Sequence, residues 1–266
     1  MAKFTFISFN IRKQQKLLEE IVNYVSKKGN KRNIIFAIQE MPGESKVNKL
    51  NVPHNVSLQK RAGLGFVFSK HINACMNKLK VSGDDISGTR KNAMLLTVPL
   101  DFESLHIVNI HATAKKDGDD DPKKTNRILF QNIEYILGGN SKRIYMGDFN
   151  TNPYEENLVS DEVLYTSREM EEVRNGLTKI SFYNPGWRYL REKKGICSTY
   201  CDQKFFPRWQ LLDHILISKI LCQKTIYSYN ILNGFSNKKF EISEFLKNAK
   251  KDGFSDHLPV SLTMEI

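Results

Sequence analysis

A chain of 266 residues can bury one large hydrophobic core, and its 40% hydrophobic content with 16 Phe and 10 Tyr is ordinary for a globular protein. No stretch approaches the roughly 20 apolar residues of a membrane-spanning helix, so we expect no integral membrane segment. The net charge of +11 fits attraction to a polyanion such as nucleic acid, attraction to an anionic membrane surface, or simply a well-hydrated surface.

The apolar run near the N-terminus and the placement of the cysteines indicate the cellular compartment in which the protein is expected. The short alternating run Phe4–Phe9 predicts a first strand and not a signal sequence. The four cysteines are irregularly placed, Cys197 and Cys201 are too far apart for a CxxC motif, and no His cluster completes a zinc site. We therefore expect reduced thiols in a cytoplasmic protein, with a disulfide as the lesser alternative, and we expect a monomer.

Apolar periodicity predicts alternating strands and helices along the chain. Helical spacing covers Lys13–Lys27 and Asn126–Leu137, and weaker helical patterns cover Glu155–Arg174 and Ile242–Lys250. The polar segment Lys115–Lys124 predicts a solvated loop, because it lacks the ligand spacing of a calcium loop. Strand-like runs lie at Phe4–Phe9, Ile34–Ile38, Leu64–Phe68, Ala93–Val98, Ser104–Ile110, Arg143–Met146, Leu211–Ile217 and Val260–Met264.

The order of these elements predicts the architecture. Many strands with interspersed helices indicate an α/β protein in which helices cover buried sheets. The chain shows no internal repeat and no long linker rich in Pro, Gly or Ser. We therefore expect a single domain over residues 1–266.

Polar clusters lie at or near the ends of six apolar runs. Each cluster alone is explained by a helix cap, a turn residue or a satisfied polar group. Together they indicate one cleft, because strand ends on one rim of a sheet converge. The clusters contain Asn10, Glu40, His111, Asp148 with Asn150, Asp213 with His214, and Asp256 with His257.

These residue types suit phosphate chemistry. Carboxylates without Cys ligands favour a hard ion such as Mg²⁺ or Mn²⁺, which neutralises a phosphodiester and polarises its oxygen. Histidine titrates near neutrality and moves protons, especially when a carboxylate fixes its tautomer. In the Gly147-Asp148-Phe149-Asn150 turn, the Asp148 carboxylate can bind a metal or take a proton, and the Asn150 carboxamide can hold an anionic oxygen.

The ordered series of clusters resembles the endonuclease/exonuclease/phosphatase superfamily, which has the DNase-I-like fold. The resemblance runs from the first strand to the last, and it is most specific in the GDFN motif at 147–150 and the SDHLPV motif at 255–260. It implies two stacked β-sheets flanked by helices, a four-layer αββα sandwich.

The resemblance also implies roles for the acidic residues. Glu40 would be the principal Mg²⁺ ligand, helped by Asn10 and Asp256. Asp148 would serve as general base or as ligand of a second metal ion, since members of the family use this position in both ways. Asp213 would orient His257.

The remaining roles concern the substrate. His257 would activate or position the attacking water, or contact the scissile phosphate. His111 would stabilise the transition state or protonate the leaving oxygen. Asn150 would hold a phosphate oxygen, and Arg90 matches a phosphate-contacting arginine of DNase-like members, although a solvated turn charge explains it equally well.

Departures from family patterns narrow the expected activity. Arg12 stands where apurinic-site endonucleases carry an aspartate, and those enzymes tend to have Tyr at the position of His111. Thr151-Asn152-Pro153 and Asp213-His214 also differ from the patterns of inositol-phosphate 5-phosphatases. The stretch Lys60–Gly63 lacks the carboxylate that supports the equivalent of His111 in DNase-like members.

The sequence therefore predicts a Mg²⁺- or Mn²⁺-dependent phosphodiesterase, most specifically a nuclease that hydrolyses DNA by in-line attack of water. One alternative is a phosphatase or phospholipase of the same fold that acts on a small or lipid phosphoester. The alternative of another class is a non-catalytic nucleic-acid-binding protein on this fold.

Overall fold

The computed structural model describes most of the chain, and everything below concerns these residues. The described ranges are 2–61, 63–77, 92–114, 121–138, 141–160, 163–176, 181–190, 199–202, 208–232 and 255–266. Arg90 and the weak helical pattern Ile242–Lys250 lie outside them.

The first sheet of the described part has six strands in the order β14-β15-β1-β2-β4-β3. Its central strand β1 (Lys3–Asn10) runs parallel to β2 (Asn33–Gln39) and antiparallel to β15 (Val260–Glu265). The remaining strands are β3 (Val56–Arg61), β4 (Leu64–Ser69) and β14 (Ile226–Ile231).

The second described sheet has seven strands in the order β5-β6-β7-β8-β13-β10-β9. At its centre β7 (Ser104–His111) runs parallel to β8 (Lys142–Asp148), and β13 (Asp213–Ser218) runs antiparallel to β8. The other members are β5 (Cys75–Asn77), β6 (Ala93–Pro99), β9 (Tyr165–Ser167) and β10 (Ser181–Tyr183). A separate hairpin-like pair consists of β11 (Tyr200–Asp202) and β12 (Arg208–Gln210).

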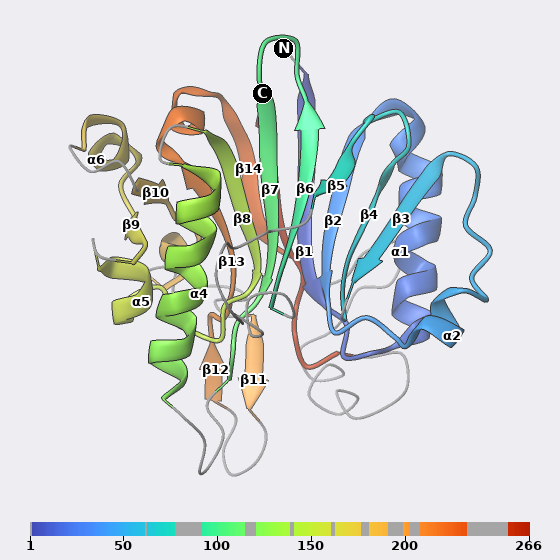
Figure 1. Cartoon of the computed structure of the whole chain (residues 1–266), viewed down its shortest axis with the longest axis horizontal. Helices are drawn as coiled ribbons and strands as arrows, with labels where there is room; N and C mark the ends of the chain where they lie inside the picture. The colour runs from blue at the N-terminus through green and yellow to red at the C-terminus, as the bar shows by residue number, and fades with distance from the viewer. Residues whose placement is uncertain are drawn as a thin grey trace.

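Helices cover the outer faces of both sheets (Figure 1). On the first sheet, α1 (Gln15–Lys28) packs its Leu17, Ile21 and Val25 against outward-facing strand residues. On the second sheet, α4 (Pro122–Leu137) packs through Leu129, Phe130 and Ile133. Shorter helical segments are α2 (Glu44–Val47), α5 (Glu156–Val159), α6 (Met170–Asn175), η1 (Gly29–Lys31), η2 (Pro185–Leu190) and η3 (Lys219–Gln223).

A hydrophobic core fills the space between the sheets, which confirms the predicted four-layer αββα sandwich. Phe6 of β1, Ile107 of β7 and Met146 of β8 belong to this inner core. The neighbouring residues Ile7 and Tyr145 belong instead to the outer cores under α1 and α4. These strands read as continuous apolar runs because both of their faces are buried.

Two sequence predictions were wrong in detail. The pattern over Glu155–Arg174 divides into α5, β9 and α6, because Tyr165–Ser167 pairs in parallel register with β10. The segment Pro122–Lys124, predicted as loop, forms the first turn of α4, where the Asp121 side chain accepts a hydrogen bond from the Lys123 amide at 3.0 Å.

Candidate active site

The predicted site residues converge because of strand direction. The carboxyl ends of β1, β2, β7 and β8 lie at one rim of the sandwich and present Asn10, Glu40, His111 and Asp148 there. Strands β13 and β15 run the opposite way, so they bring Asp213 and His257 to the same rim at their beginnings. The rim thus joins residues from across the chain, as the sequence predicted.

The inner face of the sandwich changes from apolar to polar towards this rim. Along β7 the inward positions are Ile107, Asn109 and His111, and along β8 Met146 is followed by Asp148. Asp148 is 2% exposed, whereas the side chains of His111 and Glu40 are 31% and 32% exposed. The rim therefore combines a buried carboxylate with partly solvent-accessible groups beside it.

Gly147 explains the first residue of the GDFN motif. Its φ is 153°, and a Cβ atom there would lie 1.9 Å from the Ile110 carbonyl oxygen. Only glycine permits this approach of β8 to β7. The approach places Asp148 directly opposite His111 in the parallel register.

Asn10 and Asn150 order the carboxylates. The Asn10 amide nitrogen donates to Glu40 Oε1 at 3.2 Å and to Asp148 Oδ2 at 3.1 Å. The Asn150 backbone amide donates to Asp148 Oδ1 at 2.9 Å, and the Asn150 side chain donates to the Ala112 carbonyl at 2.7 Å. Both oxygens of Asp148 are thereby fixed in direction.

His111 lies between two of these carboxylates. Its Nε2 atom is 3.9 Å from Glu40 Oε1 and 3.9 Å from Asp148 Oδ2. The stretch Lys60–Gly63 contains no acidic residue. The acidic neighbours of His111 are Glu40, which follows β2, and Asp148, the last residue of β8.

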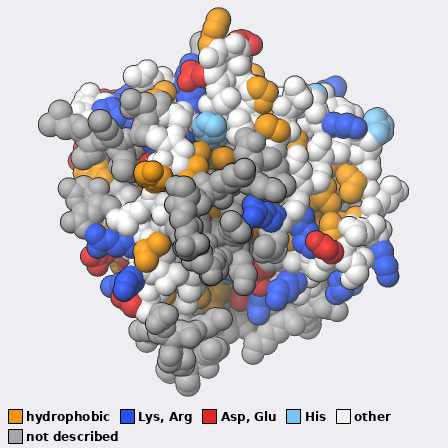
Figure 2. All heavy atoms as spheres, viewed as in Figure 1, with side chains coloured by type: hydrophobic (Ala, Val, Ile, Leu, Met, Phe, Trp, Pro, Cys, Tyr) orange, Lys and Arg blue, Asp and Glu red, His pale blue; other side chains and the backbone are white. Residues whose placement is uncertain are grey.

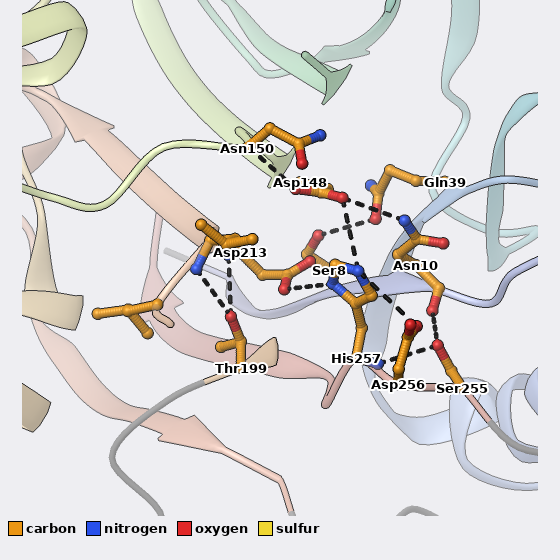
Figure 3. A network of polar contacts seen from close by, with 12 residues as sticks. Ser8, Asn10, Gln39, Asp148, Asn150, Thr199, Asp213, Ser255, Asp256 and His257 are labelled. Carbon is orange, nitrogen blue, oxygen red and sulfur yellow. Dashed lines mark hydrogen bonds and ion pairs between the residues drawn. The ribbon is translucent and has the colours of Figure 1, made fainter. Parts of the chain in front are cut away.

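His257 and Asp213 form a buried imidazole–carboxylate pair (Figure 3). His257 Nδ1 is 2.8 Å from Asp213 Oδ2, and its Nε2 lies 3.7 Å from Asp148 Oδ2. The Tyr200 ring packs against the imidazole at a centroid distance of 4.9 Å. Asp213 therefore fixes which nitrogen of His257 faces the cleft.

Burial and neighbouring charge set the protonation of this pair. Burial raises the pKa of Asp213 to about 6, against the lowering effect of His257. Burial alone would lower the pKa of His257, but Asp213, Asp148 and Asp256 together raise it above its ordinary value. The three carboxylates therefore favour the protonated form of the imidazole.

Asp256 lies beside this pair and contacts a basic residue. Arg12 Nη1 is 2.9 Å from Asp256 Oδ2. Burial raises the pKa of Asp256, while His257 and Arg12 lower it. Arg12 thus balances the charge of Asp256 at the rim.

The structure adds supporting residues to which the sequence assigned no role. Thr199 Oγ1 accepts hydrogen bonds from the backbone amides of Leu212 and Asp213 at 3.0 Å each. Ser255 Oγ donates to the Asn10 carbonyl at 2.6 Å and accepts from the His257 amide at 3.1 Å. The Ser-x-His spacing of a serine turn could have indicated Ser255, whereas nothing local marks Thr199.

His214 also has a supporting role. Its ring is fully buried on the outer face of the second sheet, edge-on to Phe149. Its Nε2 is 3.0 Å from the Thr151 carbonyl, and Asn184 Nδ2 approaches its Nδ1 at 3.4 Å. His214 thus holds the turn that carries Asn150 from behind and does not face the cleft.

A metal ion has suitable donors at this rim. Asp148, Asp213 and His257 offer ligand atoms that all lie within 4.8 Å of one another. Asp256 Oδ1 is buried and has no hydrogen-bond partner among the described residues. A cavity of about 580 Å³ at the opposite end, near Phe4 and Ile266, has no comparable cluster among its described lining residues.

The structure is thus a two-sheet α/β protein whose strand ends carry a cluster of acidic residues and histidines. The model of the Endonuclease/Exonuclease/phosphatase family matches residues 67–266. The chain therefore belongs to this family, and membership supports a phosphoesterase.

Solved structures with the same fold resemble the whole chain. AP endonuclease LMAP from Leishmania major has a TM-score of 0.61 and 15% identity, over 100% of this chain and 88% of that one. Humanised D. rerio TDP2 has a TM-score of 0.60 and 15% identity, over 100% of both chains. The Neisseria 3′ phosphatase NExo bound to a product DNA hairpin has a TM-score of 0.59 and 16% identity, over 100% of both chains.

Two further findings complete the comparison. No curated protein sequence matches the chain. Among the helices of the described ranges, none combines the length and apolar character needed to cross a bilayer.

Proposed function

We propose that this protein is a Mg²⁺- or Mn²⁺-dependent phosphodiesterase, most specifically a nuclease that hydrolyses DNA. The observation that carries the proposal is the convergence of Glu40, His111 and Asp148 with the His257–Asp213 pair at one rim. Such a rim can bind a cation, orient a water molecule and supply protons, which are the three requirements of phosphodiester hydrolysis.

The residues at the rim fit a hard divalent cation. We place it at Glu40 and Asp256, since Glu40 is accessible and Asp256 Oδ1 is free of hydrogen bonds within the described part. Asn10 Oδ1 accepts from the Arg12 amide at 3.1 Å and has a second lone pair, so it can join these ligands while its Nδ2 keeps the bonds to Glu40 and Asp148. His257 Nδ1 is already bound to Asp213, which argues against a cation between them. When bound, the cation neutralises the phosphate and polarises its oxygen.

The protein's own groups then divide the remaining work. Asp148, with its oxygens fixed by Asn10 and Asn150, acts as the base that receives the proton of the attacking water. Because its pKa is raised, His257 carries a proton and donates a hydrogen bond to the scissile phosphate. The sequence left open whether His257 activates the attacking water or contacts the phosphate, and its raised pKa favours contact with the phosphate.

His111 and Asn150 complete the cleft. His111 Nε2 lies beside both Glu40 and Asp148 and is positioned to protonate the leaving oxygen or to stabilise the transition state. The Asn150 carboxamide has a second N–H besides the one bound to Ala112, and we assign it to a phosphate oxygen. The proposed phosphate contact of Arg90 falls on a residue outside the described part.

Surface features near the rim favour nucleic acid as the substrate. A groove of about 410 Å³ at the start of α1 is lined by Lys13, Lys16 and Lys46, together with Glu19. Lys13 adjoins the rim, because its amide donates to the Glu40 carbonyl at 2.6 Å. D. rerio TDP2 has been solved with a single-strand DNA product and NExo with a DNA hairpin, which supports DNA as the polyanion.

The test is a metal-dependent activity panel. Plasmid DNA, single-stranded DNA, RNA, an inositol phosphate and sphingomyelin are each incubated with the protein and Mg²⁺ or Mn²⁺. We expect cleavage of DNA that EDTA abolishes. Glu40→Gln and His257→Ala should lose at least about 100-fold in rate while their circular dichroism spectra stay unchanged.

Other results would indicate a different substrate, a different class of protein or a different site. Cleavage restricted to the inositol phosphate or sphingomyelin would replace DNA by a small or lipid phosphoester. DNA binding without hydrolysis of any substrate would indicate a binding protein on this fold. Full activity of Glu40→Gln would overturn the site assignment. A monomeric state and a cytoplasmic location stay predictions, checked by light scattering and by cell fractionation.

A further inference from the structure

A polar cluster interrupts the hydrophobic core directly beneath the proposed catalytic rim. Ser8 of β1, Gln39 of β2 and Asn109 of β7 are each 0% exposed. They come from both sheets and meet in the space that other strand residues fill with apolar side chains. Buried amides are costly unless they are hydrogen-bonded, so the contacts of this cluster determine its role.

Asn109 connects the two sheets through its side chain. Its Nδ2 donates to the carbonyls of Ile38 and Gly65, each at 2.9 Å. Its Oδ1 accepts from Gln39 Nε2 at 2.6 Å, and Ser8 Oγ approaches Gln39 Oε1 at 3.5 Å. One residue of the second sheet is thus bound at three points to the first.

The bound carbonyls mark the place where the regular pairing of β2 with β4 is interrupted. The regular antiparallel ladder of these strands is interrupted after the pair Ile38↔Gly65, and the next bond between the two segments is that from the Met41 amide to the Gly63 carbonyl at 2.7 Å. Two residues after Ile38, Glu40 has a left-handed φ of 50°. Asn109 therefore supplies hydrogen bonds where the strand ladder is interrupted, and it helps the backbone bonds of Gln39, Glu40 and Met41 to hold the segment that carries Glu40.

The same side chain lies next to His111 in the strand. Asn109 and His111 are two residues apart on β7, so both point to the inner face. His111 Nε2 and Glu40 Oε1 are 3.9 Å apart across the cleft. The bonds of Asn109 join the strand that carries one of these groups to the strand that carries the other.

We propose that Asn109, with Gln39 as its partner, is a positioning residue that sets the placement of Glu40 relative to His111. The proposal rests on the proposed function, since it gives these two groups a shared task. Asn109 touches neither substrate nor cation. It acts by fixing the separation of the two sheets at the one end where that separation decides catalytic geometry.

The experiment compares Asn109→Leu with a matched control on the same strand. Leucine has a similar volume but removes all three hydrogen bonds. Ile107→Ala is the control, because Ile107 lies two residues earlier, is fully buried in the same core and bonds to nothing at the rim. Gln39→Met is the milder second variant, because it keeps both bonds from Asn109 to the carbonyls.

We expect Asn109→Leu to lower kcat on DNA by about 10- to 100-fold with little change in KM, because misplacement of reacting groups costs rate more than binding. The increase of Tm on addition of Mn²⁺ should shrink, and the ring signals of His111 in NMR spectra should move. Gln39→Met should show the same changes to a smaller degree. Ile107→Ala should lower Tm without any of these three effects.

The outcomes separate this proposal from the proposed function. If the wild-type protein hydrolyses no phosphodiester, the proposed function fails. The positioning role of Asn109 is then still tested by the NMR signals of His111 and by the increase of Tm on addition of Mn²⁺. If folded Asn109→Leu or Gln39→Met keeps the wild-type His111 signals and Mn²⁺ response, the positioning role is overturned. If Ile107→Ala changed kcat, the Mn²⁺ response and the His111 signals as much as Asn109→Leu does, the positioning role would be overturned, and Asn109 would contribute to stability alone.

Discussion

Four non-glycine residues of the described chain adopt left-handed backbone conformations. Arg12, Lys13, Glu40 and Asn150 have φ values of 48°, 59°, 50° and 47°. All four lie at the rim, and each such conformation costs roughly 1 kcal/mol or more for a residue other than Asn or Gly. At Glu40 the turn reverses strand alternation, so that Gln39 enters the core and Glu40 still reaches the cleft. Strain at the rim is the expected companion of a functional site.

His214 makes a testable contribution at the scale of one residue. Burial lowers its pKa to about 4, against an ordinary value of 6.5. Between these pH values the unfolded chain binds the proton and the folded chain does not, so His214 makes the protein less stable as the pH falls from 6.5 to 4. Over this pH range the free energy of unfolding falls by about 3 kcal/mol because of His214.

The measurement is urea unfolding of the wild type and of His214→Gln at a series of pH values. Glutamine keeps a donor for the Thr151 carbonyl but cannot be protonated. The loss of unfolding free energy in acid should therefore be smaller in the variant by up to about 3 kcal/mol. Replacement of the exposed His71 by Gln serves as control. Parallel pH curves for wild type and His214→Gln would contradict the prediction.

At the scale of elements, a buried ion pair attaches α4 to the second sheet. Glu134 of α4 contacts Arg143 of β8 at 2.5 Å and accepts a hydrogen bond from the Tyr145 hydroxyl. Arg143 is 1% exposed and its guanidinium also lies over the Phe182 ring. Burial raises the pKa of Glu134, while Arg143 and Tyr145 lower it.

We expect Glu134→Ala to destabilise the protein by about 3–5 kcal/mol, because it leaves the Arg143 charge buried without its carboxylate. The combination of Glu134→Leu, Arg143→Met and Tyr145→Phe should recover most of this loss, because it removes the carboxylate, the guanidinium and the hydroxyl together. Thermal and urea unfolding measure both effects. A triple variant as unstable as Glu134→Ala would show that packing, and not charge burial, determines the cost.

At the scale of the whole molecule, the net charge of +11 has a local counterpart near the site. Figure 2 shows Lys and Arg side chains at the lower right of the visible face, where Figure 1 places α1 and α2. The groove of Lys13, Lys16 and Lys46 lies in this part of the molecule. Such a groove suits the phosphate backbone of a nucleic acid that extends from the cleft.

DNA binding should therefore weaken steeply with salt, and replacement of Lys13, Lys16 and Lys46 by Gln should make the dependence shallower. Each lost phosphate contact lowers the slope of log K against log salt by about 0.9, so the triple variant loses up to about 3. Fluorescence anisotropy with labelled DNA in EDTA measures the slope without cleavage. Replacement of Lys27, Lys28 and Lys31, beyond the groove, is the control. Equal slopes for the groove variant and wild type would place the DNA elsewhere.

Local patterns in the sequence were sufficient for the main elements. The sequence predicted the bounds of helices α1 and α4 and of the main central strands to within a few residues, because each carries a dense apolar pattern. These strands contain Phe6, Ile35, Ile107, Ile144 and Leu262. The edge strand β9 and its neighbour β10 were missed, since a strand of three residues is too short to show a periodicity. Their pairing depends on neighbours that are distant in the chain.

The identity of the rim residues was also readable from the chain, because catalytic residue types stood at strand ends in a recognisable order. Their mutual geometry was not. The pairing of Asp213 with His257 is the exception, because the family resemblance implied it. The position of His111 between Glu40 and Asp148 and the outward burial of His214 depend on strand order across two sheets. Residue type and periodicity are local properties of a chain, whereas distance, burial and the resulting pKa values arise only when strands far apart in sequence are packed together.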